Sequence, residues 1–208
     1  AVHGETVYAC DEDQRLRALN LGTGKGREGL EAHRVHGPPT VRGDRLYVAG
    51  DEKLLILDGS SGKLLASHDL PGQAALAPEV VEGAVFVLTA DGKCHRLDLD
   101  DGEIRWSVAA GKESLQALAH RGGRLFVRAD EHVLALNPAT GKQLWKYDVP
   151  QPATRAMIFA GVKAGADRLY VEPRPLAVSD EAVYLAGDDR VLAVSAEDGE
   201  RMWSHRPD

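Results

Sequence analysis

One short segment occurs five times along this chain, and this repetition restricts the possible folds more than any other feature of the sequence. Each copy is an apolar segment centred on an aromatic residue, and the five rings are Tyr8, Tyr47, Phe86, Phe126 and Tyr184. Successive rings are 39, 39, 40 and 58 residues apart. A period of about 20–50 residues is typical of proteins that repeat one supersecondary unit. The sequence therefore predicts five copies of one unit, with extra residues between the fourth and the fifth.

The order of segments is the same in every unit. The aromatic segment is followed by an acidic turn and then by a segment that alternates apolar and polar residues, such as Val133–Asn137. Alternation with a period of two is typical of half-buried strands. A glycine-containing turn and a last short segment come next, and this last strand is expected to end at Trp106, Trp145 or Trp203 where a tryptophan is present. Another short apolar segment precedes each aromatic one, so that each unit has four predicted antiparallel strands.

Four-stranded units that repeat at this interval have to pack face to face, and a ring of them is a β-propeller. The predicted fold is therefore an all-β propeller of about five four-stranded antiparallel blades. A β-sandwich would not repeat its turn residues every 39 residues. The expected blades are residues 1–36, 37–73, 74–113, 114–150 and 174–208, with a hairpin insertion at residues 151–173 between the fourth and the fifth.

All five units are expected to form a single domain over residues 1–208. The first strand begins at Ala1, without the proline-containing segment that precedes other units at Pro39, Pro78 and Pro175. This difference predicts that the chain was excised from a longer protein.

Charge and composition exclude two classes of partner. The chain carries 25 Lys and Arg residues against 32 Asp and Glu residues, a formal net charge of −7. Proteins that bind nucleic acids need a basic surface for the phosphate backbone, so nucleic acid is not an expected partner. The longest apolar stretches are far shorter than the roughly 18 residues of a membrane-spanning helix, so no membrane span is expected. Cys10 and Cys94 are predicted to be free strand cysteines, because two cysteines form no disulfide framework.

The segment from Asn137 to Trp145, with the sequence NPATGKQLW, closely resembles the tryptophan-docking repeat of pyrroloquinoline-quinone-type propellers. That repeat family includes the BamB-like propellers and the repeat or sensor domains of some actinobacterial serine/threonine kinases. The resemblance covers all five units. It implies that Trp106, Trp145 and Trp203 are structural and dock each blade against a neighbour. The equivalent positions in the first two units are Glu28 and Ala66, so looser contacts are expected there.

An enzymatic alternative also follows from the resemblance. Quinoprotein dehydrogenases resemble a larger ring of eight blades that holds a quinone beside a calcium ion, and many have a disulfide between adjacent cysteines. In this chain Cys10 and Cys94 are 84 positions apart, and no segment matches the calcium ligands. The favoured function is therefore a noncatalytic binding, scaffold or sensor module with no catalytic residue, cofactor or metal. The alternative is a fragment of a quinoprotein-type dehydrogenase, and the full-length parent could be that enzyme or a kinase.

The acidic turns and the insertion are expected on the same face of the propeller, because both lie at the same end of their blades. Asp is a common turn former, so the acidic residues have a purely structural explanation as well. If they bind a partner, it is a protein or small ligand that is basic or carries a cation. The candidate binding face comprises Asp130, Glu131, Asp188 and Asp189 from the turns and Arg155, Lys163, Arg168 and Arg174 from the insertion and its end. The compartment stays open, with a slight preference for an extracytoplasmic one.

Overall fold

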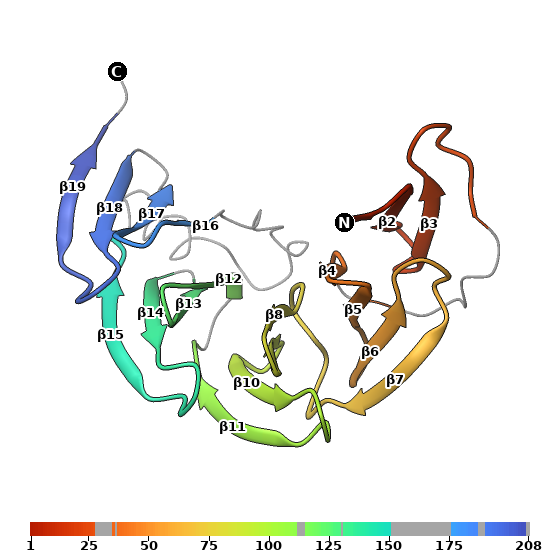
Figure 1. Ribbon diagram of the computed structural model, residues 1–208. Coiled ribbons are helices and arrows are strands. Elements are labelled where there is room, and N and C mark those ends of the chain that lie inside the picture. The colour runs from red at the N-terminus through yellow and green to blue at the C-terminus, as the bar shows by residue number, and fades with distance from the viewer. Residues whose placement is uncertain are drawn as a thin grey trace, which may run out of the picture. The chain divides into compact units, whose positions relative to one another are not determined.

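In the computed structural model, the described part of the chain is all-β and consists of five antiparallel sheets (Figure 1). The structure describes residues 1–27, 35, 37–111, 115–129, 131–150, 176–186 and 190–206. Each sheet contains strands that follow one another in the sequence, and each is one blade of a β-propeller fold. The blades group into two compact units, the first unit over Ala1–Lys112 and the second unit over Glu113–Asp208.

The first unit holds three blades. Blade 1 has the strands β1 (Val2–His3), β2 (Thr6–Cys10) and β3 (Leu16–Asn20). Blade 2 has β4 (Thr40–Arg42), β5 (Arg45–Ala49), β6 (Lys53–Asp58) and β7 (Leu64–Asp69). Blade 3 has β8 (Glu79–Val81), β9 (Ala84–Thr89), β10 (Lys93–Asp98) and β11 (Ile104–Ala109). Blade 1 therefore shows three strands among its described residues, and residues 28–34 after it lie outside the described part.

The second unit holds two blades. Blade 4 has β12 (Leu115–Arg121), β13 (Arg124–Ala129), β14 (His132–Leu136) and β15 (Gln143–Asp148). Blade 5 has β16 (Leu176–Val178), β17 (Ala182–Ala186), β18 (Val191–Ser195) and β19 (Arg201–His205). The predicted hairpin insertion at residues 151–173 lies outside the described residues.

The turn between the third and fourth strand positions is built in the same way in all five blades. Its last residue is a glycine with φ between 67° and 76°, a backbone region that only glycine enters without strain. The amide of that glycine donates to the carbonyl of the residue four positions earlier, as Gly141 does to Asn137 at 2.8 Å. The side chain of the earlier residue also caps the turn, since Asn137 Oδ1 accepts from the amides of Ala139 and Thr140 at 3.0 Å each. These hydrogen bonds explain the glycine period in the sequence.

The outer strands differ from the prediction in one respect. Trp106, Trp145 and Trp203 were expected at the ends of these strands, but each lies at the third residue of its strand. The register shifts by one residue next to the tryptophan, for example where Ala135 pairs with Trp145 and Leu136 pairs with Gln143. The extra residue of this β-bulge precedes the ring, and regular pairing continues beyond the ring to the end of the strand.

Apolar residues fill the space between neighbouring blades of a unit. We call the face of a blade that contacts the following blade its C-side face and the opposite one its N-side face. In the second unit, Phe126, Ala135 and Trp145 on the C-side face of blade 4 form one buried cluster with Val183, Leu185 and Val194 on the N-side face of blade 5. Two equivalent clusters join blades 1 and 2 and blades 2 and 3. The core of each unit therefore consists of layers between blades.

The two cysteines are free, as predicted. Cys94 is fully buried in β10, and this burial raises the pKa of its thiol to about 12. Cys10 is only half-buried at the end of β2. Among the residues that the structure describes, no helix is long and apolar enough to cross a bilayer.

Candidate functional site

Trp145 contacts the next blade through both its ring and its nitrogen. Its side chain is 7% exposed, and Nε1 donates to the carbonyl of Ala196 in blade 5 at 3.1 Å. The ring lies directly over Gly199, since a Cβ added to that glycine would be 2.7 Å from the indole. The glycine required by the turn is therefore also the surface on which the tryptophan of the preceding blade rests.

Each of the other two tryptophans lies beside the aromatic residue on the second strand of its own blade. Trp106 lies 5.7 Å from Phe86 between ring centroids, and Trp203 lies 6.1 Å from Tyr184. Trp106 is half-buried, whereas Trp203 is 45% exposed.

Blade 2 contacts blade 3 through a residue that was not predicted from the sequence. Ala66 occupies the position of the tryptophan, and the ring that lies over Gly102 of blade 3 is His68, two residues further along β7. A Cβ at Gly102 would overlap this imidazole. In the described structure His68 Nε2 is buried without a hydrogen-bond partner. Alternate residues of a strand share a face, so His68 lies on the same face as Ala66. A search for a ring two residues beyond the tryptophan position would have found this histidine.

Blade 1 contacts blade 2 through an aromatic residue of an inner strand. The Tyr8 hydroxyl, which is buried, donates to the carbonyl of Gly59 at 2.9 Å. The His3 ring lies beside the same glycine, 3.0 Å from the position that a Cβ would take. This pair was not predicted from the sequence, because the docking repeat indicates a ring on the outer strand and Tyr8 and His3 lie on inner strands.

Carboxylates gather at the turns between the second and third strands of the blades in the first unit. Because these turns join equivalent strands, they emerge at the same end of each blade. The exposed residues of this set, which we call the acidic turns, are Glu12, Asp13, Asp51, Glu52 and Asp91. Glu52 has a φ of 52°, so the sharp bend of its turn is made by a residue other than glycine.

Two carboxylates at these turns have a structural role. Asp11 accepts from the Arg15 amide at 2.8 Å and from Arg17 Nε at 2.6 Å, and these bonds lower the pKa of its carboxyl. Asp91 accepts from Lys93 Nζ and from Thr89 Oγ1, both at 2.6 Å, which lowers its pKa in the same way. Asp11 and Asp91 thus stabilise their own turns, as the turn-forming explanation predicts.

Asp91 is also the end of a hydrogen-bonded chain that reaches a buried histidine. The Thr89 hydroxyl donates to Asp91 and therefore accepts from His95 Nε2 at 2.9 Å, which leaves Nδ1 to accept from the Ser107 hydroxyl at 2.7 Å. Burial lowers the pKa of His95, against the opposing effect of Asp91. A neutral imidazole is therefore fully hydrogen-bonded at the position where blades 2, 4 and 5 have Leu55, Leu134 and Leu192.

The structure places few of the predicted binding residues. Glu131 is exposed at the turn before β14, and its carbonyl accepts from the Val149 amide at 2.8 Å. The other candidates, Asp130, Asp188, Asp189, Arg155, Lys163, Arg168 and Arg174, lie outside the described residues. Within the described ranges, no three His, Cys, Asp or Glu residues are grouped closely enough to hold a metal ion.

Sequence comparison finds one matching family. The profile of the outer membrane protein assembly factor BamB matches residues 12–122 and 118–208. The chain is 24% identical to BamB of Yersinia pestis over 224 residues, which cover 98% of this chain and 55% of that protein. It is 31% identical to BamB of Bordetella pertussis over 130 residues, which cover 62% of this chain and 28% of that protein. The chain spans about half the length of the Yersinia pestis relative and of a similar one from Moranella endobia.

Solved structures show the same fold. BamB from Moraxella catarrhalis superposes with a TM-score of 0.66 at 18% identity, over 97% of this chain and 58% of that one. A quinohemoprotein alcohol dehydrogenase from Pseudomonas putida HK5 superposes with a TM-score of 0.60 at 20% identity, over 83% of this chain and 34% of that one. At such identities the likeness concerns the fold alone.

Proposed function

The chain belongs to the BamB family of outer membrane protein assembly factors, and we propose that it is a noncatalytic propeller module that binds another protein. The blades supply a rigid scaffold, and the turns between strands carry recognition, as is usual for binding proteins of this kind. The relatives are named for assembly at the outer membrane, which favours an extracytoplasmic location for this chain.

The observation that carries this proposal is the repetition of exposed carboxylates at equivalent turns. Within the described part of the chain, Glu12, Asp13 and Glu52 are exposed and take part in none of the ion pairs found there. Asp11 and Asp91 have Arg17 and Lys93 beside them and hold the turns in shape. Fixed carboxylates that project from rigid turns attract basic partners and orient them. The proposed partner therefore presents Lys or Arg side chains to the acidic turns.

We propose a contact surface of the same kind for the second unit, formed by its own turns and the insertion. Its acidic groups would be Asp130, Glu131, Asp188 and Asp189. Arg155, Lys163, Arg168 and Arg174 would add the basic groups that recognise carboxylates of the partner. Deletion of residues 155–168 is then expected to reduce binding while the blades remain folded.

The quinoprotein alternative has less support. Its likeness to this chain concerns the fold, and the residues present do not fit the quinone site, because Cys10 and Cys94 lie on β2 and β10 of different blades. Burial also holds the Cys94 thiol protonated. A titration with pyrroloquinoline quinone and Ca²⁺ tests this alternative, and binding at micromolar concentration or tighter would favour it over the noncatalytic proposal.

Two synthetic peptides of equal length, one rich in Lys and Arg and one rich in Asp and Glu, provide the test of the acidic turns. We expect fluorescence anisotropy to detect binding of the basic peptide only, and the affinity to fall as salt shortens the screening length to about 10 Å at 0.1 M. A variant with Glu12→Gln, Asp13→Asn, Asp51→Asn and Glu52→Gln should lose this binding. Equal binding of both peptides, or an unchanged affinity in this variant, would contradict the proposal.

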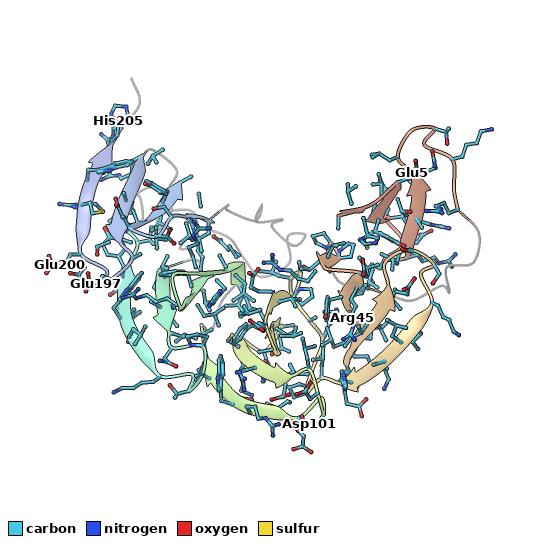
Figure 2. The ribbon with its side chains drawn as sticks, viewed as in Figure 1. Glu5, Arg45, Asp101, Glu197, Glu200 and His205 are labelled. Carbon is cyan, nitrogen blue, oxygen red and sulfur yellow. The ribbon has the colours of Figure 1, made fainter. Side chains whose placement is uncertain are left out.

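A matched control removes four carboxylates from the opposite end of the blades. Its changes are Asp100→Asn, Glu103→Gln, Glu197→Gln and Glu200→Gln, all in the turns that precede outer strands. Figure 2 shows Glu197 and Glu200 at the turn between β18 and β19. The net charge changes equally in both variants, so a loss of binding in the control as well would indicate attraction by total charge and not by the acidic turns.

A further inference from the structure

Blade 3 has a histidine opposite a serine of its outer strand, where blade 2 has a leucine. Ser107 on β11 pairs with His95 on β10, and the Ser107 hydroxyl lies 2.7 Å from His95 Nδ1. Ser67 of blade 2 occupies the same strand position and pairs with Leu55. The first unit therefore contains two serines at equivalent positions, and one of them has an imidazole beside it.

The imidazole is oriented so that it can accept a proton from this serine. His95 Nε2 is 2.9 Å from the Thr89 hydroxyl, and that hydroxyl donates to the Asp91 carboxylate at 2.6 Å. Nε2 therefore carries the ring proton, and Nδ1 is the acceptor that faces Ser107. A serine is activated as a nucleophile by a neighbouring base that a third group holds in orientation. Ser107, His95 and Thr89 have this arrangement, and Asp91 lies behind Thr89.

The serine and the histidine differ in their access to solvent. His95 is 2% exposed, whereas Ser107 is exposed on the outermost strand of its sheet. Burial lowers the pKa of His95, which keeps the imidazole neutral at pH 7 and able to take up a proton. A reagent in solution therefore reaches the hydroxyl, while the base beside it stays buried.

The backbone at Ser107 adds a hydrogen-bond donor on the accessible side. The Ala110 amide donates to the Gly92 carbonyl at 2.8 Å, and hydrogen-bonded pairs alternate along an antiparallel ladder from that point. The pair of Ser107 and His95 is therefore a non-hydrogen-bonded one, in which the side chains are close and the Ser107 amide points away from β10. Because β11 is the last strand of the described sheet, this amide faces its edge. An amide in this place can donate to the oxygen of a carbonyl group that Ser107 attacks.

We infer that Ser107 is a site of covalent acylation, at which His95 activates the hydroxyl toward esters with a good leaving group. Ser107 Oγ attacks the carbonyl carbon of the ester while its proton passes to His95 Nδ1. The bond between this carbon and the leaving oxygen then breaks, and the leaving oxygen takes the proton from His95. The acyl group remains on Ser107 as an ester, and the imidazole is neutral again. This inference goes beyond the proposed function, because the reaction needs no protein partner.

Incubation of the full chain with p-nitrophenyl acetate, followed by digestion and peptide mass spectrometry, tests the inference. We expect Ser107 to be acetylated at least roughly tenfold faster than Ser67, because a positioned general base accelerates a reaction by about a hundredfold or more. Ser67 is the control within the same sample, since it is also exposed on the outer strand of a blade and faces a leucine.

Variants of the base and of the residue that orients it complete the test. His95→Leu gives blade 3 the leucine of blades 2, 4 and 5, and it should lower the acetylation rate of Ser107 to that of Ser67. Thr89→Val should also slow the reaction, whereas Thr89→Ser keeps the hydroxyl and should preserve it. Circular dichroism establishes that each variant is folded. Equal rates at Ser107 and Ser67 in the wild-type chain, or an unchanged rate at Ser107 in the folded His95→Leu variant, would overturn the inference.

Discussion

Blade 4 and blade 2 contact the blade that follows them with different rings at different positions. Trp145 lies over Gly199 and also donates a hydrogen bond to Ala196. His68 lies over Gly102 from a position two residues further along its strand, and its buried Nε2 has no hydrogen-bond partner in the described structure. In these two contacts the glycine at the turn is the constant part. The ring that covers it can change in chemistry and in position.

The two contacts should also differ in strength. A buried indole removes roughly 150–250 Å² from water, and the nitrogen of Trp145 is satisfied. The imidazole of His68 is smaller and leaves a buried polar atom unpaired, which costs about 1–3 kcal/mol. The sequence predicted a looser contact after blade 2 because Ala66 replaces tryptophan. That remains a prediction, and the His68 ring now gives it a second physical reason.

The largest effect is expected at Trp145. Trp145→Ala should lower the free energy of unfolding by about 3–5 kcal/mol, as for other large aromatic residues in packed cores. Chemical denaturation followed by circular dichroism measures this change. Trp203→Ala, at the equivalent but exposed position, serves as the control and should cost much less. Similar losses for both residues would show that burial between blades does not govern their contribution.

Glycine substitutions separate the contact from the backbone requirement. Gly24→Ala has only the strain of a positive φ, about 1–2 kcal/mol, because space is open around the Cβ position. Gly199→Ala has the same strain and in addition forces the Trp145 ring away, which should cost roughly 1–3 kcal/mol more. The difference between the two unfolding free energies therefore measures the contact itself. Equal losses would mean that the ring moves aside without cost.

A stabilising change is expected in the other contact. His68→Leu should raise the free energy of unfolding by about 1 kcal/mol, because it removes an unpaired buried nitrogen and keeps an apolar side chain near Gly102. The control is His205→Leu, since His205 is exposed on β19 (Figure 2) and its replacement should leave stability unchanged. Destabilisation by His68→Leu would show that the imidazole stabilises the contact despite its unpaired nitrogen.

The smallest effect is a dependence on pH that belongs to the contact between blades 2 and 3. His95 lies on the N-side face of blade 3 with Val85, Val87 and Leu97, and burial lowers its pKa in the folded state. The unfolded chain then binds a proton more readily than the folded chain. The contribution of neutral His95 to the free energy of unfolding should therefore be fully present above the unfolded pKa of about 6.5 and be lost as the pH drops through the folded pKa. His95→Leu should reduce this acid sensitivity in thermal unfolding between pH 7 and pH 5. An unchanged slope would assign the sensitivity to other groups.

The fold followed from the sequence because the constraints were local and repeated. Each aromatic strand, alternating strand and turn glycine reflects a requirement of its own backbone. That requirement can be recognised in the sequence of one repeat. The position of the tryptophans at the third strand residue did not follow, because the β-bulge beside them depends on pairing with the neighbouring strand. His68 was missed for a related reason, since its role depends on which glycine of another blade lies under it.

The candidate binding face was harder to predict. Acidic residues favour turns whether or not they bind a partner, and the roles of Asp11 and Asp91 became apparent only from the cations beside them. Sequence spacing identified Glu131 at an exposed turn but could not determine what it contacts. The exposed ring of Trp203 was predicted to be equivalent to that of Trp145, and only the surroundings of each blade distinguish them.

The turn glycine has a consequence for how chains of this kind change in length over evolutionary time. One residue meets two demands, because the turn of its own blade requires a positive φ and the ring of the preceding blade requires the missing side chain. A gene segment that encodes one repeat therefore carries both a ring for the next blade and a platform for the previous one. Duplication or loss of whole repeats then joins compatible surfaces without new mutations, as in other repeat proteins stabilised by nearest-neighbour contacts. Relatives almost twice as long as this chain can consequently share its blades.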